Sequence, residues 1–289
     1  MNVFKLRLTD KEFHYLNKES FETLTNKSKP WYQKDVNGES HFAICPSCIN
    51  TTQIIGLKSF DDDKPLYARH YLKTSISDLG IFDKDAYETC PRANTNKISK
   101  NSKRSLKSTL GEKIKNTIIE EFDRVIYLLN KQSPITLSKK AITEMLSYYR
   151  QEKGWLYKGC TLDNIPWTFA YMTMAVNVFG KKVPDKDLQQ ALIDRYPNVY
   201  FDKNNYLCVE DYSEFISASF CFMHHKRILT DHNLEESIVF SVADSNQKQI
   251  YKKTIEFDHQ HFCNLIAKKD SIYRDQSLID LARKILTIA

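Results

Sequence analysis

Residues 40–57 read SHFAICPSCINTTQIIGL, in which two runs of β-forming residues flank a Cys-Pro-Ser-Cys motif. Phe, Ile and Thr favour strands, and the motif between the two runs is typical of a tight turn. A CxxC turn places two thiolates on one side of the chain, at the spacing that a tetrahedral metal ion requires. The stretch therefore predicts a β-hairpin that carries a zinc knuckle formed by Cys45 and Cys48.

A structural zinc ion needs four protein ligands, so two more must come from elsewhere in the chain. The downstream candidates are His70, within LYARHY, and Cys90, within YETCP. Together with Cys45 and Cys48 they form a Cys3His set with the spacing Cys-x2-Cys-x21-His-x19-Cys. His41 lies one strand length before the knuckle and is an alternative to His70.

The CxxC motif has two other interpretations, a thioredoxin-like redox pair or two unrelated thiols. A redox CxxC lies between a strand and a helix, whereas β-forming sequence follows this motif at once. The metal interpretation is therefore favoured. In this stretch alone the chain resembles the zinc ribbons of nucleic-acid proteins, although its second ligand pair lacks the CxxC of a ribbon.

The composition is that of a folded protein with a sizeable core. The chain has 289 residues, of which 42% are hydrophobic and 12% aromatic. It has 7 glycines and neither GxGxxG nor GxxxxGK[ST], so it lacks the usual signatures of Rossmann and P-loop nucleotide binding. Without a signal-peptide pattern or an apolar run of about 18 residues, we expect a soluble, cytoplasmic protein that does not engage a membrane.

Seven cysteines, an odd number, indicate reduced thiols rather than a disulfide framework. Four of them lie outside the candidate ligand set, among apolar or aromatic neighbours. We expect these to pack as small core residues. They are Cys160, Cys208, Cys221 and Cys263.

A basic segment follows the candidate zinc module. From Pro91 to Gly111 the chain is rich in Lys, Arg, Asn, Ser and Thr, and the first acidic residue is Glu112. The net charge of +6 is compatible with an anionic partner. We expect a linker that attracts phosphates, although such segments are also common as plain mobile connections. The candidate phosphate-binding residues here are Arg92, Lys97, Lys100, Lys103, Arg104 and Lys107.

Helical periodicity dominates the middle of the chain. Apolar residues between Ile114 and Leu129 recur at helical spacing, and Ser133-Pro134 ends this pattern. Further helices are expected over residues 141–149, 166–179 and 185–196. The helix over residues 166–179 is apolar on all sides, which is typical of a helix inside a bundle.

The last third mixes hairpins and helices. Residues 199–201 and 206–209 flank a turn signal, as do residues 238–242 and 250–257. A helix is expected to begin near Asp211 and to run into residues 224–227, and two more helices close the chain, the first capped by Asp258. This order resembles a winged-helix-like module in which Lys226 and Arg227 contact nucleic acid; alternatively, these cations interact with the helix C-terminus.

The start of the chain predicts a strand within the first eight residues. A capping box at Thr9-Asp10-Lys11-Glu12 then predicts a short helix with Phe13 and Leu16, and residues 28–38 are expected to form a loop. The acidic run at residues 60–65 is expected to be a solvated turn rather than a Mg or Ca site, since oxygen-ligand sites space their carboxylates.

The whole chain is expected to be an α+β protein. Its expected parts are a zinc-stabilised β-hairpin module at 1–91, a basic linker at 92–111, a helical domain at 112–197 and a mixed α/β domain at 198–289. The expected function is non-enzymatic binding of DNA or RNA through phosphates.

Two other functions stay open. The chain could be a protein-interaction subunit of a larger nucleoprotein assembly, for example of a mobile-element or defence system. It could also be a metal-dependent nuclease-type hydrolase, although no HExxH or GxSxG motif marks an active site. The hydrolase would use Asp231, Asp258, His224, His225, His232, His259 and His261.

Overall fold

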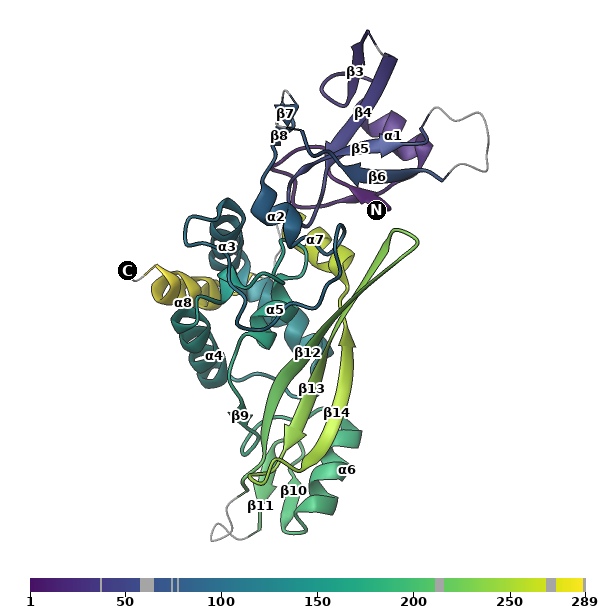
Figure 1. The fold of residues 1–289 in the computed structure, drawn as a ribbon. Helices are drawn as coiled ribbons and strands as arrows, with labels where there is room; N and C mark the ends of the chain where they lie inside the picture. The colour runs from purple at the N-terminus through teal and green to yellow at the C-terminus, as the bar shows by residue number, and fades with distance from the viewer. Residues whose placement is uncertain are drawn as a thin grey trace.

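The computed structural model describes residues 1–36, 38–57, 65–73, 75–76, 78–210, 216–268 and 274–287. It contains helices and several antiparallel sheets, which confirms the mixed α+β class (Figure 1). Most of the acidic run at 60–65 and the start of the helix expected at Asp211 lie outside the described residues. Each helix in these ranges is too short or too polar to cross a lipid bilayer.

A four-stranded antiparallel sheet dominates the N-terminal part. Its strands, in spatial order, are β3 (Tyr32–Asp35), β4 (Gly38–Ile44), β5 (Thr51–Ile55) and β6 (Tyr67–His70). His41, Ile54 and Ala68 are cross-strand neighbours on its buried face. The ring of Tyr32 on the same face packs against Phe21 of helix α1 (Lys18–Thr25). The loop expected over residues 28–38 is therefore wrong at residues 32–35, because these pair with β4.

The chain before this sheet is more extended than its capping signal predicts. The helix expected after Thr9 is wrong, because β1 (Val3–Phe4) pairs with β2 (His14–Tyr15). Asp10 accepts a hydrogen bond from the backbone N–H of Arg7, which closes a turn instead of a helix. Helix α1 starts later, where the side chain of Asn17 accepts the N–H of Ser20. The remaining elements before the basic segment are β7 (Ser75–Ile76), β8 (Gly80–Ile81) and α2 (Lys84–Glu88).

Helices form the middle of the molecule. Helix α3 (Thr109–Gln132) ends at Ser133, as predicted, and packs against α5 (Ile165–Tyr171). It also packs against α7 (His259–Ala267) and α8 (Gln276–Leu286), so helices from the middle and the end of the chain share a core. The other helical elements are α4 (Lys139–Gln151), the 3-10 helix η1 (Gly154–Leu156) and α6 (Lys186–Arg195).

A second four-stranded sheet has the order β14-β13-β12-β9. Its long strands are β12 (Ser219–Thr230), β13 (Asn233–Ala243) and β14 (Gln249–Glu256), and they run down one side of the molecule (Figure 1). The predicted hairpin of β13 with β14 is confirmed, as is that of β10 (Val199–Phe201) with β11 (Leu207–Val209).

This second sheet overturns two helix predictions. Residues 219–230 form β12, in which Phe220 and Phe222 are buried with the period of two that defines a strand. Residues 224–227 are therefore in a strand, and the winged-helix arrangement is wrong. The helix expected over 166–179 stops at Tyr171, because β9 (Val176–Asn177) pairs with β12.

The tip of the β12–β13 hairpin reaches the N-terminal part. The backbone N–H of Asn2 donates to the carbonyl of His232, at 3.2 Å. The His232 ring stacks on Tyr67 of β6 with 4.5 Å between centroids and 7° between planes. Two distant segments of the chain therefore meet beside the first sheet.

Candidate metal centre and adjoining groove

The predicted ligands Cys45, Cys48, His70 and Cys90 form one buried cluster, in which the ligand atoms all lie within 4.8 Å of one another. Ile44 pairs with Thr51, so the first two cysteines lie in the connection between β4 and β5. His70 ends β6, and Cys90 follows helix α2. Three separate pieces of chain thus bring four ligands together.

The geometry of the cluster suits a tetrahedral ion. The Sγ atoms of Cys45 and Cys90 are 3.7 Å apart, and Cys48 Sγ is 3.3 Å from His70 Nε2. A zinc ion bound at the usual Zn–S length of about 2.3 Å places two thiolates about 3.8 Å apart. These ligands could therefore hold a metal ion, and they would fill all four positions of a tetrahedron.

The pKa values of the four ligands are shifted in different directions. Burial opposes the charge on Cys45, but hydrogen bonds from Cys48 and Cys90 outweigh it and hold the pKa of Cys45 well below its usual value. Burial likewise opposes the charge on His70, yet the nearby cysteines raise the pKa of His70 to about 10. Burial raises the pKa of Cys48 and of Cys90. A metal ion would displace protons here, because it binds thiolates and neutral imidazole.

Asn50 ties the cysteine turn to helix α2. Its Nδ2 donates to Cys48 Sγ at 3.5 Å and to the carbonyl of Asp83 at 3.0 Å, and its Oδ1 accepts the N–H of Asp83 at 2.7 Å. Asp83 in turn caps α2 by accepting the N–H of Ala86. Outer contacts of this kind orient metal ligands.

A buried ion pair joins the same turn to the body of the molecule. Arg92 donates through Nε to Ser47 Oγ at 2.9 Å and through Nη2 to Asp163 at 3.0 Å. Ser47 Oγ and Thr161 Oγ1 also donate to the Asp163 carboxylate, at 2.8 and 2.7 Å. Burial would raise the pKa of Asp163, but the charge of Arg92 outweighs it and holds that pKa below its usual value.

The geometry does not support His41 as a metal ligand or Cys45 and Cys48 as a thioredoxin-like redox pair. His41 lies outside the cluster, with its ring against Tyr32 and its Nε2 3.4 Å from Glu39. The pair Cys45 and Cys48 belongs to a four-ligand cluster rather than to a strand–helix junction. Among the other cysteines, Cys160 and Cys263 are buried, while Cys208 and Cys221 are partly exposed.

The candidate phosphate-binding residues of the basic segment differ in their surroundings. Arg92 and Arg104 are buried, and Arg104 donates to the carbonyls of Tyr157 and Lys158. These two side chains are thus unavailable to a phosphate in this conformation. Lys103 pairs with Glu152 at 3.0 Å, and Lys100 donates to the carbonyl of Thr173 at 3.3 Å. Lys97 and Lys107 are exposed.

The candidate cations of β12 also differ. Lys226 is exposed, whereas Arg227 donates to the carbonyls of Thr89 and Asn96 and so holds the basic segment against the strand. The strand carries a β-bulge between Met223 and Lys226. Bulges re-aim side chains, and here His225 is directed into the core.

The C-terminal histidines do not form a second ligand cluster. Within the described residues, the candidate metal site is the Cys3His group. His225 and His259 instead contact the two oxygens of buried Glu236, at 3.0 and 2.8 Å. Burial would raise the pKa of Glu236, but these hydrogen bonds hold it well below its usual value. His224 is exposed on β12, and His261 follows the N-cap Asp258 that was predicted.

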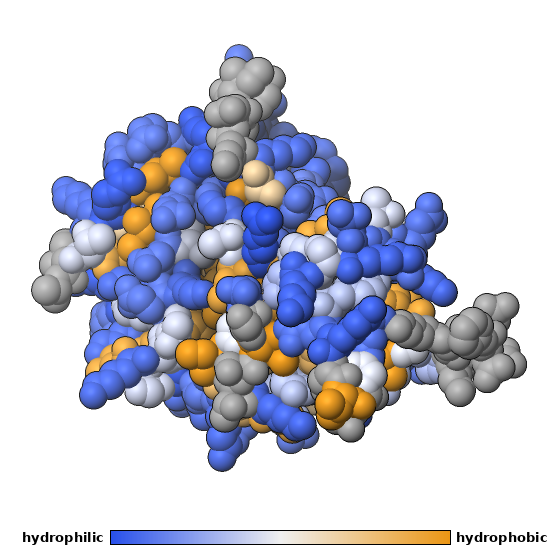
Figure 2. All heavy atoms as spheres, turned by 90° about the horizontal axis from the view of Figure 1, so that it is seen from above, coloured by the Kyte–Doolittle hydropathy of each residue, from blue (hydrophilic) through white to orange (hydrophobic). Residues whose placement is uncertain are grey.

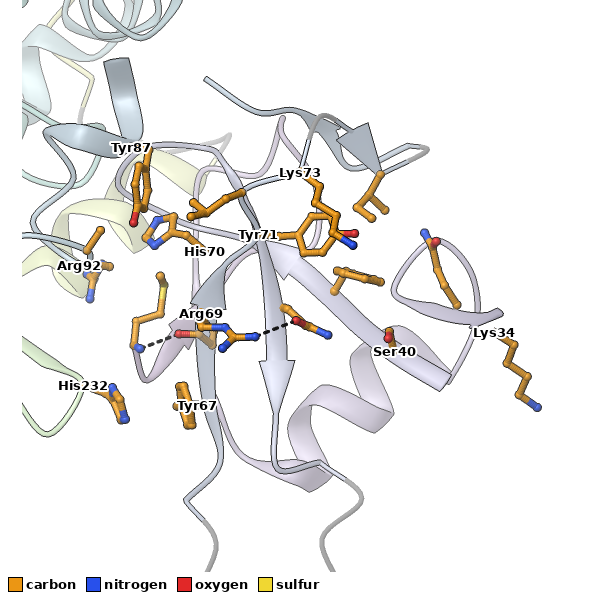
Figure 3. A pocket seen from close by; sticks show the side chains of 18 residues that line it. Lys34, Ser40, Tyr67, Arg69, His70, Tyr71, Lys73, Tyr87, Arg92 and His232 are labelled. Atoms are coloured by element: carbon orange, nitrogen blue, oxygen red, sulfur yellow. Dashed lines mark hydrogen bonds between the residues drawn. The ribbon is translucent and has the colours of Figure 1, made fainter. Parts of the chain in front are cut away.

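A groove of about 850 Å³ adjoins the metal cluster on the outer face of the first sheet. Figure 3 shows the basic side chains of Arg69 and Lys73 around it, together with the rings of Tyr67 and Tyr71, whereas Lys34 lies at its rim and points away. His70 and Arg92 line its inner end, and His232 lies beside Tyr67. No Asp or Glu is among the described residues that line it.

Sequence reasoning missed this groove, although a signal was present. In YARHY, residues 67–71, Tyr67, Arg69 and Tyr71 alternate with the buried Ala68 and His70, which is the pattern of a strand with a functional outer face. Seen from above, hydrophilic side chains cover most of the surface at this end, and hydrophobic residues show between them in separate patches (Figure 2).

Comparison with known proteins gives no relative from which a function could be inferred. No protein-family model, no curated protein and no solved structure matches this chain.

Proposed function

We propose that Cys45, Cys48, His70 and Cys90 bind a structural zinc ion that stabilises the β4–β5 hairpin and the segments around it. Three thiolates and one imidazole are a donor set typical of zinc. Four protein ligands complete the coordination sphere and leave no position for a catalytic water. The ion would therefore stabilise the fold rather than catalyse a reaction.

The test of this part is the metal content of the purified protein by elemental analysis. The wild type is expected to carry about one zinc ion per chain, and Cys48→Ser, His70→Ala and Cys90→Ser are expected to carry none. Cys208→Ser and His41→Ala are matched controls that should keep the metal, because both residues lie outside the cluster. A wild type without zinc would overturn the proposal.

We further propose that the protein binds nucleic acid, and that the groove on the first sheet is the binding surface. The observation that supports this is the lining of the groove, where Arg69 and Lys73 lie without a carboxylate among the described lining residues. Lys34 lies at the rim, because its side chain is on the other face of the sheet, beside Glu39 at 3.9 Å. Cations concentrated in a concave site attract phosphates and release counterions when phosphates bind.

The proposed metal and the proposed binding surface are physically connected. His70 is both a member of the ligand cluster and a residue that lines the groove. Arg69 precedes it on β6 and donates to Gln53 of β5 at 3.4 Å. A metal on His70 would hold the end of β6 in place and thereby position Arg69. The exposed Lys97 and Lys107 of the basic segment are a second, separate set of candidates.

The test is a titration of a fluorescent oligonucleotide, followed by anisotropy at several salt concentrations. Two phosphate contacts, at Arg69 and Lys73, predict that the logarithm of the association constant falls with the logarithm of salt with a slope between about −1.4 for a single strand and about −1.8 for a duplex. The double variant Arg69→Glu/Lys73→Glu should bind more weakly and with a shallower slope. Lys97→Glu/Lys107→Glu examines the basic segment in the same way.

The matched control is Lys140→Glu/Lys203→Glu, which changes two exposed lysines outside the groove and alters the net charge equally. Its affinity should stay close to that of the wild type. If the wild type does not bind, or if the groove and control variants lose the same affinity, the groove proposal is wrong. Loss confined to Lys97→Glu/Lys107→Glu would assign binding to the basic segment.

A further inference from the structure

The strand pattern of the first sheet decides which side chains face the groove. Phe42, Gln53 and Arg69 are cross-strand neighbours, and side chains alternate between the two faces along each strand. Tyr67 therefore projects on the same face as Arg69, two residues further along β6. The aromatic and basic groups of the groove share one surface.

Two tyrosine rings of the groove are held by packing. Tyr67 lies flat against His232, with 4.5 Å between the ring centroids. Tyr71 meets Phe42 edge to face at 5.1 Å, and Lys73 Nζ lies 5.9 Å from the Tyr71 centroid. Rings that are already oriented lose little conformational freedom when a flat ligand stacks on them.

The size of the groove limits the form of nucleic acid that can use these rings. A volume of about 850 Å³ matches a site for a compact ligand. A double helix keeps its bases stacked inside. Its wider groove, the major groove, is only about 12 Å across, so a protein surface laid against the duplex meets mainly phosphates and not the faces of the bases. Unpaired bases, by contrast, can leave the stack and lie on aromatic rings.

Resting on the proposed function, we infer that the groove recognises single-stranded nucleic acid, with Tyr67 and Tyr71 as stacking platforms for unpaired bases. Arg69 and Lys73 neutralise the phosphates that connect these bases. The combination of a basic groove and aromatic rings is the usual physical basis of single-strand binding without strong sequence preference.

The experiment compares labelled oligo(dU), oligo(U) and a DNA duplex of equal length, each titrated against the zinc-loaded full chain. The two single strands are expected to bind more tightly than the duplex. Tyr67→Leu and Tyr71→Leu are each expected to weaken single-strand binding about 5- to 150-fold, because each removes a stacking ring. Tyr67→Phe and Tyr71→Phe should restore the affinity, since they keep the ring.

Controls separate stacking from folding. Tyr127→Leu removes an exposed tyrosine on α3, outside the groove, and should leave binding unchanged. The zinc content and unfolding temperature of each leucine variant are measured with its affinity. If a variant is destabilised, its phenylalanine counterpart still reports on the ring.

The outcomes distinguish this inference from the proposed function. Equal binding of single strand and duplex, together with loss in Arg69→Glu/Lys73→Glu, would keep nucleic-acid binding and overturn single-strand recognition. Equal loss in the leucine and phenylalanine variants would also overturn it, since the hydroxyl rather than the ring would then matter. A chain that binds none of the three probes would overturn both proposals. A difference between oligo(dU) and oligo(U), which have the same base, identifies the preferred sugar within the inferred class.

Discussion

At the scale of single residues, Glu236 is the most constrained charge in the second sheet. Its side chain is fully buried, and its oxygens accept hydrogen bonds from His225 and His259 and from the Nδ2 of Asn164. His225 also contacts the hydroxyl of Tyr157 at 3.2 Å. A buried polar group is stable only when its hydrogen bonds are made, so this network specifies one arrangement of the core.

This network predicts a specific pH dependence of stability. The pKa of Glu236 is lower in the folded protein than its ordinary value of 4.5, so the ionised carboxylate stabilises the fold above that pH. The stabilisation should be lost as the pH falls from 4.5 toward the lower folded pKa. Glu236→Gln should therefore lower the free energy of unfolding by about 1.5–3 kcal/mol at neutral pH, and by less in acid.

Urea unfolding of both proteins at a series of pH values measures this difference. Acid also protonates the cysteine–histidine cluster, but that effect is common to both chains and cancels in the comparison. A constant difference between the two proteins from pH 7 to pH 3 would show that Glu236 does not carry the proposed charge.

The residue scale also shows what sequence can and cannot predict. The four clustered ligands were predicted, because CxxC spacing and cysteine chemistry are local signals. Arg92 was interpreted as a phosphate ligand, although it is buried with Asp163, 71 residues away in the chain. Nothing local to Arg92 indicates that partner. A cation in a basic segment therefore cannot be assigned to solvent or to the core from composition alone.

At the scale of elements, the Arg92–Asp163 pair joins the segment after α2 to the turn before α5, and Ser47 of the β4–β5 connection contacts both side chains. The side chains are only 4% and 0% exposed. Removing one partner of such a pair leaves an uncompensated buried charge, which costs about 3–5 kcal/mol. Arg92→Leu is therefore expected to lower the free energy of unfolding by about that amount.

A double-mutant cycle checks this prediction. Adding Asp163→Leu to Arg92→Leu removes the orphaned carboxylate and should recover part of the lost stability. Denaturant unfolding of the wild type, both single variants and the double variant provides the coupling free energy. Simple additivity of the two single effects would show that the residues act independently.

The helices were predicted correctly where a long apolar periodicity marks them. The prediction failed where pairing between distant strands determines the structure. The helices α3, α4 and α6 follow their apolar periodicity closely. Strand β12 was expected to be helical, because Ile216, Phe220 and Met223 also fit a helical face. Its antiparallel neighbours β13 and β9 determine its structure, and such long-range pairing overrides local spacing.

At the scale of the whole molecule, removal of the proposed metal should destabilise the protein measurably. An ion that binds the folded chain more tightly than the unfolded chain raises the unfolding temperature. Treatment with a chelator is therefore expected to lower the unfolding temperature of the wild type by several degrees. Cys48→Ser is the control, because a chain without the metal should not respond to the chelator. An equal response of both proteins would assign the effect to something other than this site.

The groove could not be predicted because it exists only in the assembled molecule. Its lining comes from β3, from β6 and the chain after it, and from the tip of the β12–β13 hairpin. Lys34 and His232 are separated by most of the sequence, and no spacing rule connects them. The sequence therefore predicts a basic protein that binds nucleic acid. The phosphate-binding cations that it indicates lie in the basic segment and on β12, not in this groove.

The flat contact between Tyr67 and His232 has a spectroscopic consequence. Protons above the face of an aromatic ring are shielded by its circulating electrons, so the imidazole protons of His232 should resonate upfield of their usual positions. A molecule that enters the groove and separates the two rings would shift these signals back. The hairpin tip thus carries its own nuclear magnetic resonance reporter of whether a molecule in the groove separates these two rings or leaves them stacked.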